Sequence, residues 1–231
     1  MNIDQSNIVL TCHHLTKSYT INNRSTPVLK GVDLIVHQGE IAVIQGKNGA
    51  GKTTLIEILG GLSRPNSGSI LFTRRLIESQ TNEQLAFIRR EKIGIIFQSF
   101  NLIPTWTAFE NIEAALLHTG LSKSYRCKKV KMLLEDIGLE NEKDHLPSEL
   151  SIGQQQRVAI ARALAHEPIL ILADEPTGEI DKETSKQIID YLMTPIKKKG
   201  VTLIVTTHGN FPLNVADRTY YLKDGRLQNT N

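Results

Sequence analysis

The 231-residue sequence has few aromatic residues, two cysteines and no long apolar run. A membrane-spanning helix needs about 20 mainly apolar residues in succession, and no stretch approaches that length. If the protein works at a membrane, we expect another chain to supply the span. Cys12 and Cys127 form no Cys-x-x-Cys pattern, which argues against a disulfide framework and suits a reducing compartment. The polar first seven residues lack the apolar core of a signal peptide.

Neither sign of charge predominates, because the formal net charge is only +3. The basic clusters at residues 126–129 and 197–199 are short and more typical of solvated helix faces than of a nucleic-acid arm. We therefore expect no nucleic-acid partner. A hydrophobic content of 40% is typical of a globular protein with one sizeable core, into which a smaller lobe can be inserted.

Residues 46–54 read Gly-Lys-Asn-Gly-Ala-Gly-Lys-Thr-Thr and fit the phosphate-binding pattern G-x-x-x-x-G-K-[ST]. An apolar strand is predicted before this loop and a helix after it, a context that disfavours a glycine-rich turn without a ligand. Glycines let backbone N–H groups approach phosphate oxygens, and the helix N-terminus faces the same anion. The lysine is expected to reach the β- and γ-phosphates, and the threonine that follows it to ligate Mg²⁺. The expected nucleotide-binding residues are Gly46, Asn48, Gly49, Ala50, Gly51, Lys52, Thr53 and Thr54.

Strands predicted at residues 8–15 and 28–36, joined by a polar loop at 22–27, precede the first helix and indicate an antiparallel β region. Further along, apolar segments alternate with helical patterns, which predicts an α/β fold with a mostly parallel sheet. These buried strands are expected at residues 93–97, 169–173 and 201–207. An Asp-Gly turn at residues 224–225 predicts a terminal hairpin.

Helical patterns dominate from Gln98 onward. We interpret the chain as one domain, residues 1–231, with a core formed by 1–97 and 156–231 and a helical lobe at 98–155 inserted into it.

Polar residues follow several of the predicted parallel strands. Gln98, Asp174 with Glu175, and His208 each come directly after an apolar run. The carboxyl ends of such strands share one edge, where ligands bind. Asp174 is expected to hold Mg²⁺, Glu175 to act as general base, Gln98 to contact Mg²⁺ or the attacking water, and His208 to bond the γ-phosphate. The alternatives are a solvated acidic turn and a strand-end histidine facing water.

Three residues near the start of the chain allow more than one interpretation. Tyr19 either stacks on adenine or is a partly buried sheet residue, and its spacing alone does not decide between them. His13 and His14 are adjacent, and neighbouring side chains on a strand point to opposite faces, so we expect no shared metal ion.

Residues 150–157, Leu-Ser-Ile-Gly-Gln-Gln-Gln-Arg, resemble the L-S-G-G-Q signature of ABC ATPases. The resemblance extends over nearly the whole chain in the order typical of the family. Its companion motifs are the adenine-stacking aromatic at Tyr19, the Q-loop at Gln98, the Walker B end at Asp174 and Glu175, the D-loop at residues 179–181 and the switch histidine at His208. Residues 97–104, 107–111 and 175–178 look most like the ATPase subunits of lipoprotein-release and macrolide- or peptide-efflux systems.

The resemblance implies a head-to-tail dimer that holds ATP and Mg²⁺ between two ATPase subunits. It places Ser151, the backbone N–H of Gly153, Gln154 and Asp181 at the nucleotide, and the signature faces the γ-phosphate on the partner. It also implies permease subunits in the membrane, docked near the Gln98 lobe, and a location on the cytoplasmic face of the cell membrane. The expected function is ATP hydrolysis that powers transport, with export favoured.

The sequence departs from the family at Ile152, where the signature has its first glycine. A β-branched residue resists positive φ and close approach, so we expect a weakened signature half-site. A homodimer and a heterodimer with an ATPase whose signature is intact both stay open, as does a weakly hydrolysing regulatory role. A non-transport ABC ATPase is the other alternative, although the chain has neither two ATPase units nor a long coiled coil.

Overall fold

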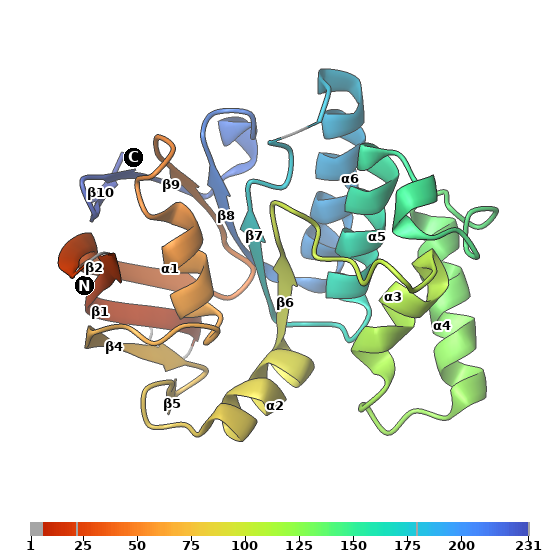
Figure 1. Cartoon of the computed structure of the whole chain (residues 1–231), viewed down its shortest axis with the longest axis horizontal. Coiled ribbons are helices and arrows are strands. Elements are labelled where there is room, and N and C mark those ends of the chain that lie inside the picture. Colours follow the sequence, from red (N-terminus) through yellow and green to blue (C-terminus); the bar gives the residue numbers. More distant parts are fainter. Residues whose placement is uncertain (1–6, 22, 179, 231) are drawn as a thin grey trace.

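Two sheets and the helices around them form the protein (Figure 1), whose computed structural model describes residues 7–21, 23–178 and 180–230. The signal-peptide interpretation rests on residues 1–7, of which 1–6 lie outside this range. Within the described residues, no helix is long and apolar enough to cross a bilayer.

The first sheet is antiparallel and has the strand order β2-β1-β4-β5. Its strands are β1 (Ile8–Ile21), β2 (Arg24–His37), β4 (Ser67–Phe72) and β5 (Arg75–Leu76). The predicted polar loop at 22–27 is wrong, because β2 begins at Arg24 and Tyr19 pairs with Thr26. β2 is an edge strand, which tolerates Pro27 because no neighbour needs its missing N–H.

The second sheet has the order β10-β9-β3-β8-β7-β6, with parallel pairing from β6 to β9. Its strands are β3 (Ile41–Gln45), β6 (Ile93–Ile96), β7 (Leu170–Asp174), β8 (Thr202–Thr207), β9 (Arg218–Lys223) and β10 (Arg226–Asn229). The central strands β7 and β8 are buried along their whole length, as expected for a sheet covered on both faces. β9 and β10 form the predicted terminal hairpin.

Helices cover both faces of this sheet, with α1 beside the antiparallel strands and α3, α4, α5 and α6 on the other side (Figure 1). They are α1 (Lys52–Leu59), α2 (Asn82–Lys92), α3 (Ala108–Glu113), α4 (Lys123–Asp136), α5 (Ile152–Leu164) and α6 (Lys182–Lys199). Short 3-10 turns lie at Ala114–Leu116, Pro147–Glu149 and Leu213–Val215. The α/β class, the antiparallel region and the inserted helices are confirmed.

Helix α5 packs on two hydrophobic clusters at once. Ile160 and Ala163 belong to a cluster formed with the parallel sheet and α6. Val158 and Ala161 belong to a second cluster, formed with α3 and α4. The helix begins at Ile152, so the signature residues form its first turn. The boundaries 97/98 and 155/156 of the helical lobe stay a prediction.

Candidate functional site

The glycine-rich loop connects β3 to α1 at the carboxyl edge of the parallel sheet. Gly51 is the N-cap of α1 with φ of 102°, a left-handed conformation that favours glycine. A Cβ atom there would lie 2.9 Å from the Cγ1 atom of Val28, so the close packing of the loop on β2 also needs glycine. At the other end, the Gly46 N–H donates to the carbonyl of Thr207 at 3.1 Å, which ties the loop to β8.

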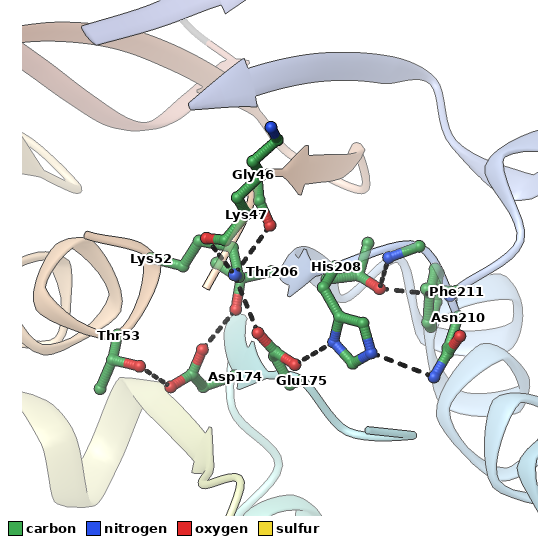
Figure 2. Close-up of polar contacts among 12 residues, drawn as sticks. Gly46, Lys47, Lys52, Thr53, Asp174, Glu175, Thr206, His208, Asn210 and Phe211 are labelled. Carbon is green, nitrogen blue, oxygen red and sulfur yellow. Dashed lines mark hydrogen bonds and ion pairs between the residues drawn. The ribbon is translucent and has the colours of Figure 1, made fainter. Parts of the chain in front are cut away.

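Lys52 is folded back into the loop (Figure 2). Its ammonium group donates to the carbonyls of Gly46 at 2.9 Å and Lys47 at 3.1 Å. It also lies 2.9 Å from Glu175 Oε1 in an ion pair whose side chains are only 5% and 8% exposed. The phosphate-binding lysine and the expected general base are therefore in direct contact.

Asp174, the last residue of β7, is held by two threonines (Figure 2). The Thr53 hydroxyl donates to Oδ2 at 2.6 Å, and the Thr206 hydroxyl donates to Oδ1 at 2.5 Å. Hard oxygen donors of this kind suit Mg²⁺, which proteins bind through one or two carboxylates together with substrate phosphates and water. The described residues contain no group of three or more His, Cys, Asp or Glu side chains placed to hold a metal ion. Thr53 and Asp174 thus fit an ion that arrives with a phosphate ligand.

Glu175 follows at φ of 46°, a strained conformation for a non-glycine residue. Its second carboxylate oxygen is hydrogen-bonded to Nδ1 of His208, and Nε2 of His208 lies 3.3 Å from the Asn210 amide (Figure 2). Burial raises the pKa of Glu175, but hydrogen bonds and charge from Lys52 and His208 outweigh it, and the pKa lies below its usual value. The carboxylate is therefore ionised at neutral pH and can accept a proton.

These groups surround a cleft of about 680 Å³. Nine of the predicted site residues line it, namely Asn48, Gly49, Gly51, Lys52, Thr53, Thr54, Gln98, Glu175 and His208. Gly46, Ala50 and Asp174 are not among the residues that line the cleft, but Gly46 bonds to Lys52 and Asp174 bonds to Thr53. Sequence reasoning thus identified a set of residues that lie together.

The predicted signature residues Ser151, Gly153 and Gln154 do not line this cleft, and Asp181 does not either. Ser151 caps α5 through a capping box, accepting from the Gln154 N–H at 3.3 Å while Gln154 Oε1 accepts from the Ser151 N–H at 2.8 Å. Asp181 caps α6 in a similar way by accepting from the N–H groups of residues 183 and 184. Residue 179 of the predicted D-loop lies outside the described residues. If the signature binds nucleotide, it does so away from the P-loop of its own chain.

Ile152 and Gly153 occupy different environments in the first turn of α5. Ile152 has a helical backbone with negative φ, so the expectation of a conflict with positive φ is wrong. Its side chain is 50% exposed. Gly153 faces α6, where a Cβ atom would lie 2.5 Å from the Cγ2 methyl of Thr184. The glycine that the sequence retains is therefore the one that packing requires.

Tyr19 lies on β1 and is 37% exposed. The ammonium of Lys17 lies 5.3 Å from the centre of its ring. The ring is thus accessible to a planar ligand, but it does not line the cleft, and stacking on adenine stays a prediction.

Two buried polar residues near the site were missed from the sequence. Thr206 orients Asp174 from the neighbouring strand β8. Gln156 on α5 donates to the carbonyl of Pro176 at 2.9 Å and so connects the signature helix to the loop after Glu175. Thr206 is one of three threonines in β8, so the sequence does not single it out, and Gln156 likewise gave no signal.

Comparison with known proteins identifies the family. A sequence model described as ABC transporter matches residues 29–178. The lipoprotein-releasing system ATP-binding protein LolD of Geobacter metallireducens is 42% identical over 213 residues, covering 92% of this chain and 95% of LolD. The macrolide export ATP-binding/permease protein MacB of Marinobacter nauticus is 41% identical over 92% of this chain, which corresponds to 33% of MacB.

Among solved structures, a dimeric post-hydrolysis state of the ATP-binding cassette MJ0796 bound to ADP and Pi matches with a TM-score of 0.88. The two sequences are 38% identical, and the match covers 96% of this chain and 99% of the MJ0796 chain. The loop, the paired threonine and aspartate, and the glutamate–histidine contact described above occur here in a fold shared with that cassette. The chain belongs to the ABC transporter family, and it is an ATP-binding subunit with ATPase activity.

Proposed function

We propose that this chain hydrolyses Mg²⁺-ATP as one half of a head-to-tail dimer, on the cytoplasmic face of the membrane, and powers export through separate permease subunits. The contact of Glu175 with both Lys52 and His208 carries the proposal, because it joins the phosphate-binding cation to an ionised base in one cleft. Neither a plain nucleotide-binding loop nor a structural ion pair requires a histidine that orients the carboxylate.

Binding requires the triphosphate to replace Glu175 as the partner of Lys52. The ammonium is already desolvated and held by two carbonyls, so an incoming β- or γ-phosphate finds it in place. Backbone N–H groups of the loop and the N-terminus of α1 add further donors. Thr53, Asp174 and Gln98 would hold Mg²⁺, which when bound neutralises part of the phosphate charge.

Hydrolysis then requires a base near the γ-phosphate. Once released from Lys52, Glu175 can accept the proton of the attacking water. His208 stays bonded to the second oxygen of the same carboxylate and orients it. The partner's Ser151 and Gly153 would complete the site from the signature helix, whose N-terminus suits an anion.

The direction of transport is inferred from the relatives. LolD is named for lipoprotein release and MacB for macrolide export, and both align with more than nine-tenths of this chain. The dimer is supported by the dimeric form of the MJ0796 cassette. A second candidate, a weakly hydrolysing partner in a heterodimer, is favoured by the exposed Ile152 at the signature.

The test is the steady-state ATPase rate of the purified chain over a range of protein concentrations. We expect a rate per subunit that rises with concentration and falls by about 100-fold or more in Glu175→Gln, since a positioned base contributes about 10²–10⁴-fold. Glu140→Gln, at an exposed position, is the matched control. A concentration-independent rate, or equal loss in both variants, would contradict the proposal.

A further inference from the structure

Arg162 connects helix α5 to the segment that follows Gln98. Its Nη1 group donates to the carbonyl of Asn101 at 2.6 Å, and its Nη2 group donates to the carbonyl of Phe100 at 2.6 Å. More than 60 residues separate the two ends of this contact along the chain. The guanidinium is half-buried and burial lowers its pKa, so its charge is solvated mainly by these two oxygens.

The backbone at the two accepting residues is unusual. Phe100 and Asn101 both have positive φ, at 59° and 49°. Left-handed conformations are unfavourable for residues with a side chain, and two in succession need support from outside. Both carbonyls accept from the same guanidinium, and the flat fork of an arginine matches two neighbouring acceptors. Arg162 supplies that support.

The same turn contains Gln98. The Phe100 N–H donates to the carbonyl of Phe97 at 3.1 Å, and the Asn101 N–H donates to the carbonyl of Ser99 at 2.6 Å. The Ser99 hydroxyl also donates to Asn101 Oδ1 at 2.9 Å. Gln98, enclosed by this chain of bonds, lines the nucleotide cleft. Movement of the turn would therefore move Gln98.

The far end of α5 carries the signature. Ser151 caps its first turn, and Gln156 bonds to the loop after Glu175. The helix between Ser151 and Arg162 packs on two hydrophobic clusters, which favours its movement as one body. A displacement at its N-terminus is thus carried to its last turn.

We propose that Arg162 is a positioning residue that couples the signature helix to Gln98. The inference rests on the proposed dimer, in which the signature of one subunit meets the nucleotide held by the P-loop of the other. Through Arg162, ATP in the opposite site sets the position of Gln98 in the subunit's own site. ATP bound in one site then changes the position of Gln98 in the other site, although the two nucleotides do not touch.

The experiment compares Arg162→Gln and Arg162→Lys with the matched control Arg64→Gln in the purified chain. Arg64, between α1 and β4, also donates to two backbone carbonyls, those of Glu78 at 3.0 Å and Gln80 at 2.8 Å, and both of these acceptors lie outside residues 97–101. We measure kcat, the KM for ATP and the Mg²⁺ concentration that gives half the maximal rate. Hydrogen exchange of the peptide spanning residues 97–106 is measured without nucleotide.

Arg162→Gln should lower kcat by about tenfold or more, since misplacing a positioned group by about 1 Å can cost 10²-fold. The KM should change by less than about twofold, while the Mg²⁺ requirement rises, because Lys52 and the loop are untouched and Gln98 is displaced. A lysine can reach only one of the two carbonyls as a point charge, so Arg162→Lys should be intermediate. The amides of Phe100 and Asn101 should exchange faster in both variants and stay unchanged in Arg64→Gln.

A rescue variant separates this role from general stability. Asn101→Gly removes the cost of positive φ at one of the two positions. In the Arg162→Gln background it should recover part of kcat and of the exchange protection, whereas a purely structural arginine would give no such recovery. Equal losses in Arg162→Gln and Arg64→Gln, or unchanged exchange at residues 97–106, would overturn the inference. If the wild-type chain hydrolyses no ATP, the proposed function fails, while the exchange comparison still decides whether Arg162 positions the turn.

Discussion

The Nζ atom of Lys52 lies 2.9 Å from Oε1 of Glu175, and both side chains are almost completely buried. The phosphate-binding cation is thus neutralised by the expected general base of the same cleft. An anionic ligand must take the place of the carboxylate before Glu175 is free to act on water. This competition links nucleotide binding to exposure of the base.

The ion pair should contribute measurably to the stability of the nucleotide-free chain. Loss of one partner from a buried pair leaves an uncompensated charge, although His208 and two carbonyls soften the effect here. In a double-mutant cycle of Lys52→Met and Glu175→Gln, we expect a coupling free energy of about 1–2 kcal/mol. Urea unfolding of the four proteins without nucleotide provides the measurement.

The pair formed by Lys143 and Asp144 serves as the control for this cycle. Its atoms are 3.8 Å apart and its side chains are 46% and 81% exposed. Exposed pairs are worth little, so a cycle of Lys143→Met and Asp144→Asn should give less than about 0.5 kcal/mol. Equal coupling energies in the two cycles would show that burial of the Lys52–Glu175 pair does not strengthen it.

The low pKa of Glu175 predicts a pH dependence of unfolding. Its folded pKa is depressed, so its contribution to stability is fully present above the usual value of 4.5 and is lost as pH falls from there through the folded pKa. The difference in unfolding free energy between wild type and Glu175→Gln should be constant from pH 7 to about 5. It should shrink below pH 4.5, as measured by urea unfolding in steps of half a pH unit. A difference that grows on acidification would mean that burial outweighs Lys52 and His208.

The contact of Gly153 with Thr184 gives a prediction about stability. An alanine at Gly153 would bring its Cβ atom to 2.5 Å from Cγ2 of Thr184, and a β-branched side chain on a helix has no free rotamer in which to move away. Gly153→Ala should therefore lower the free energy of unfolding by about 1–3 kcal/mol. Thr184→Ser removes that methyl group and should restore most of the loss in the double variant. Additive losses in the double variant would show that another contact is responsible.

The residues of the cleft could be predicted because their signals are local. The phosphate loop from Gly46 to Thr53 is one continuous motif, and Asp174, Glu175 and His208 follow apolar strands whose ends share one edge. The hairpin was missed at residues 22–27 because polar residues in an edge strand resemble a loop. Residues 24–27 are a strand because they pair with β1, and the local sequence does not show that pairing.

The contacts that connect motifs to one another could not be predicted. Thr206 bonds to Asp174 from the adjacent strand, and Gln156 and Arg162 bond to backbone carbonyls 20 and about 60 residues away. Such bonds depend on the placement of α5 against the sheet, which periodicity does not give. Backbone strain at Phe100 and Asn101 likewise has no sequence signal, because neither residue is a glycine.

Ile152 provides the last prediction, which concerns the signature half-site. Its side chain is 50% exposed on the first turn of α5, beside the N-terminal amides that would face the γ-phosphate of the opposite subunit. Removing it exposes those amides and costs little packing, so Ile152→Gly should raise kcat, by about fivefold if about 1 kcal/mol of obstruction is relieved. The series Ile152→Val, Ile152→Ala and Ile152→Gly should show rates that rise as the side chain becomes smaller, with melting temperatures nearly constant. Equal rates across the series would mean that Ile152 does not approach the nucleotide, and the argument for a heterodimer with an intact signature would lose its basis.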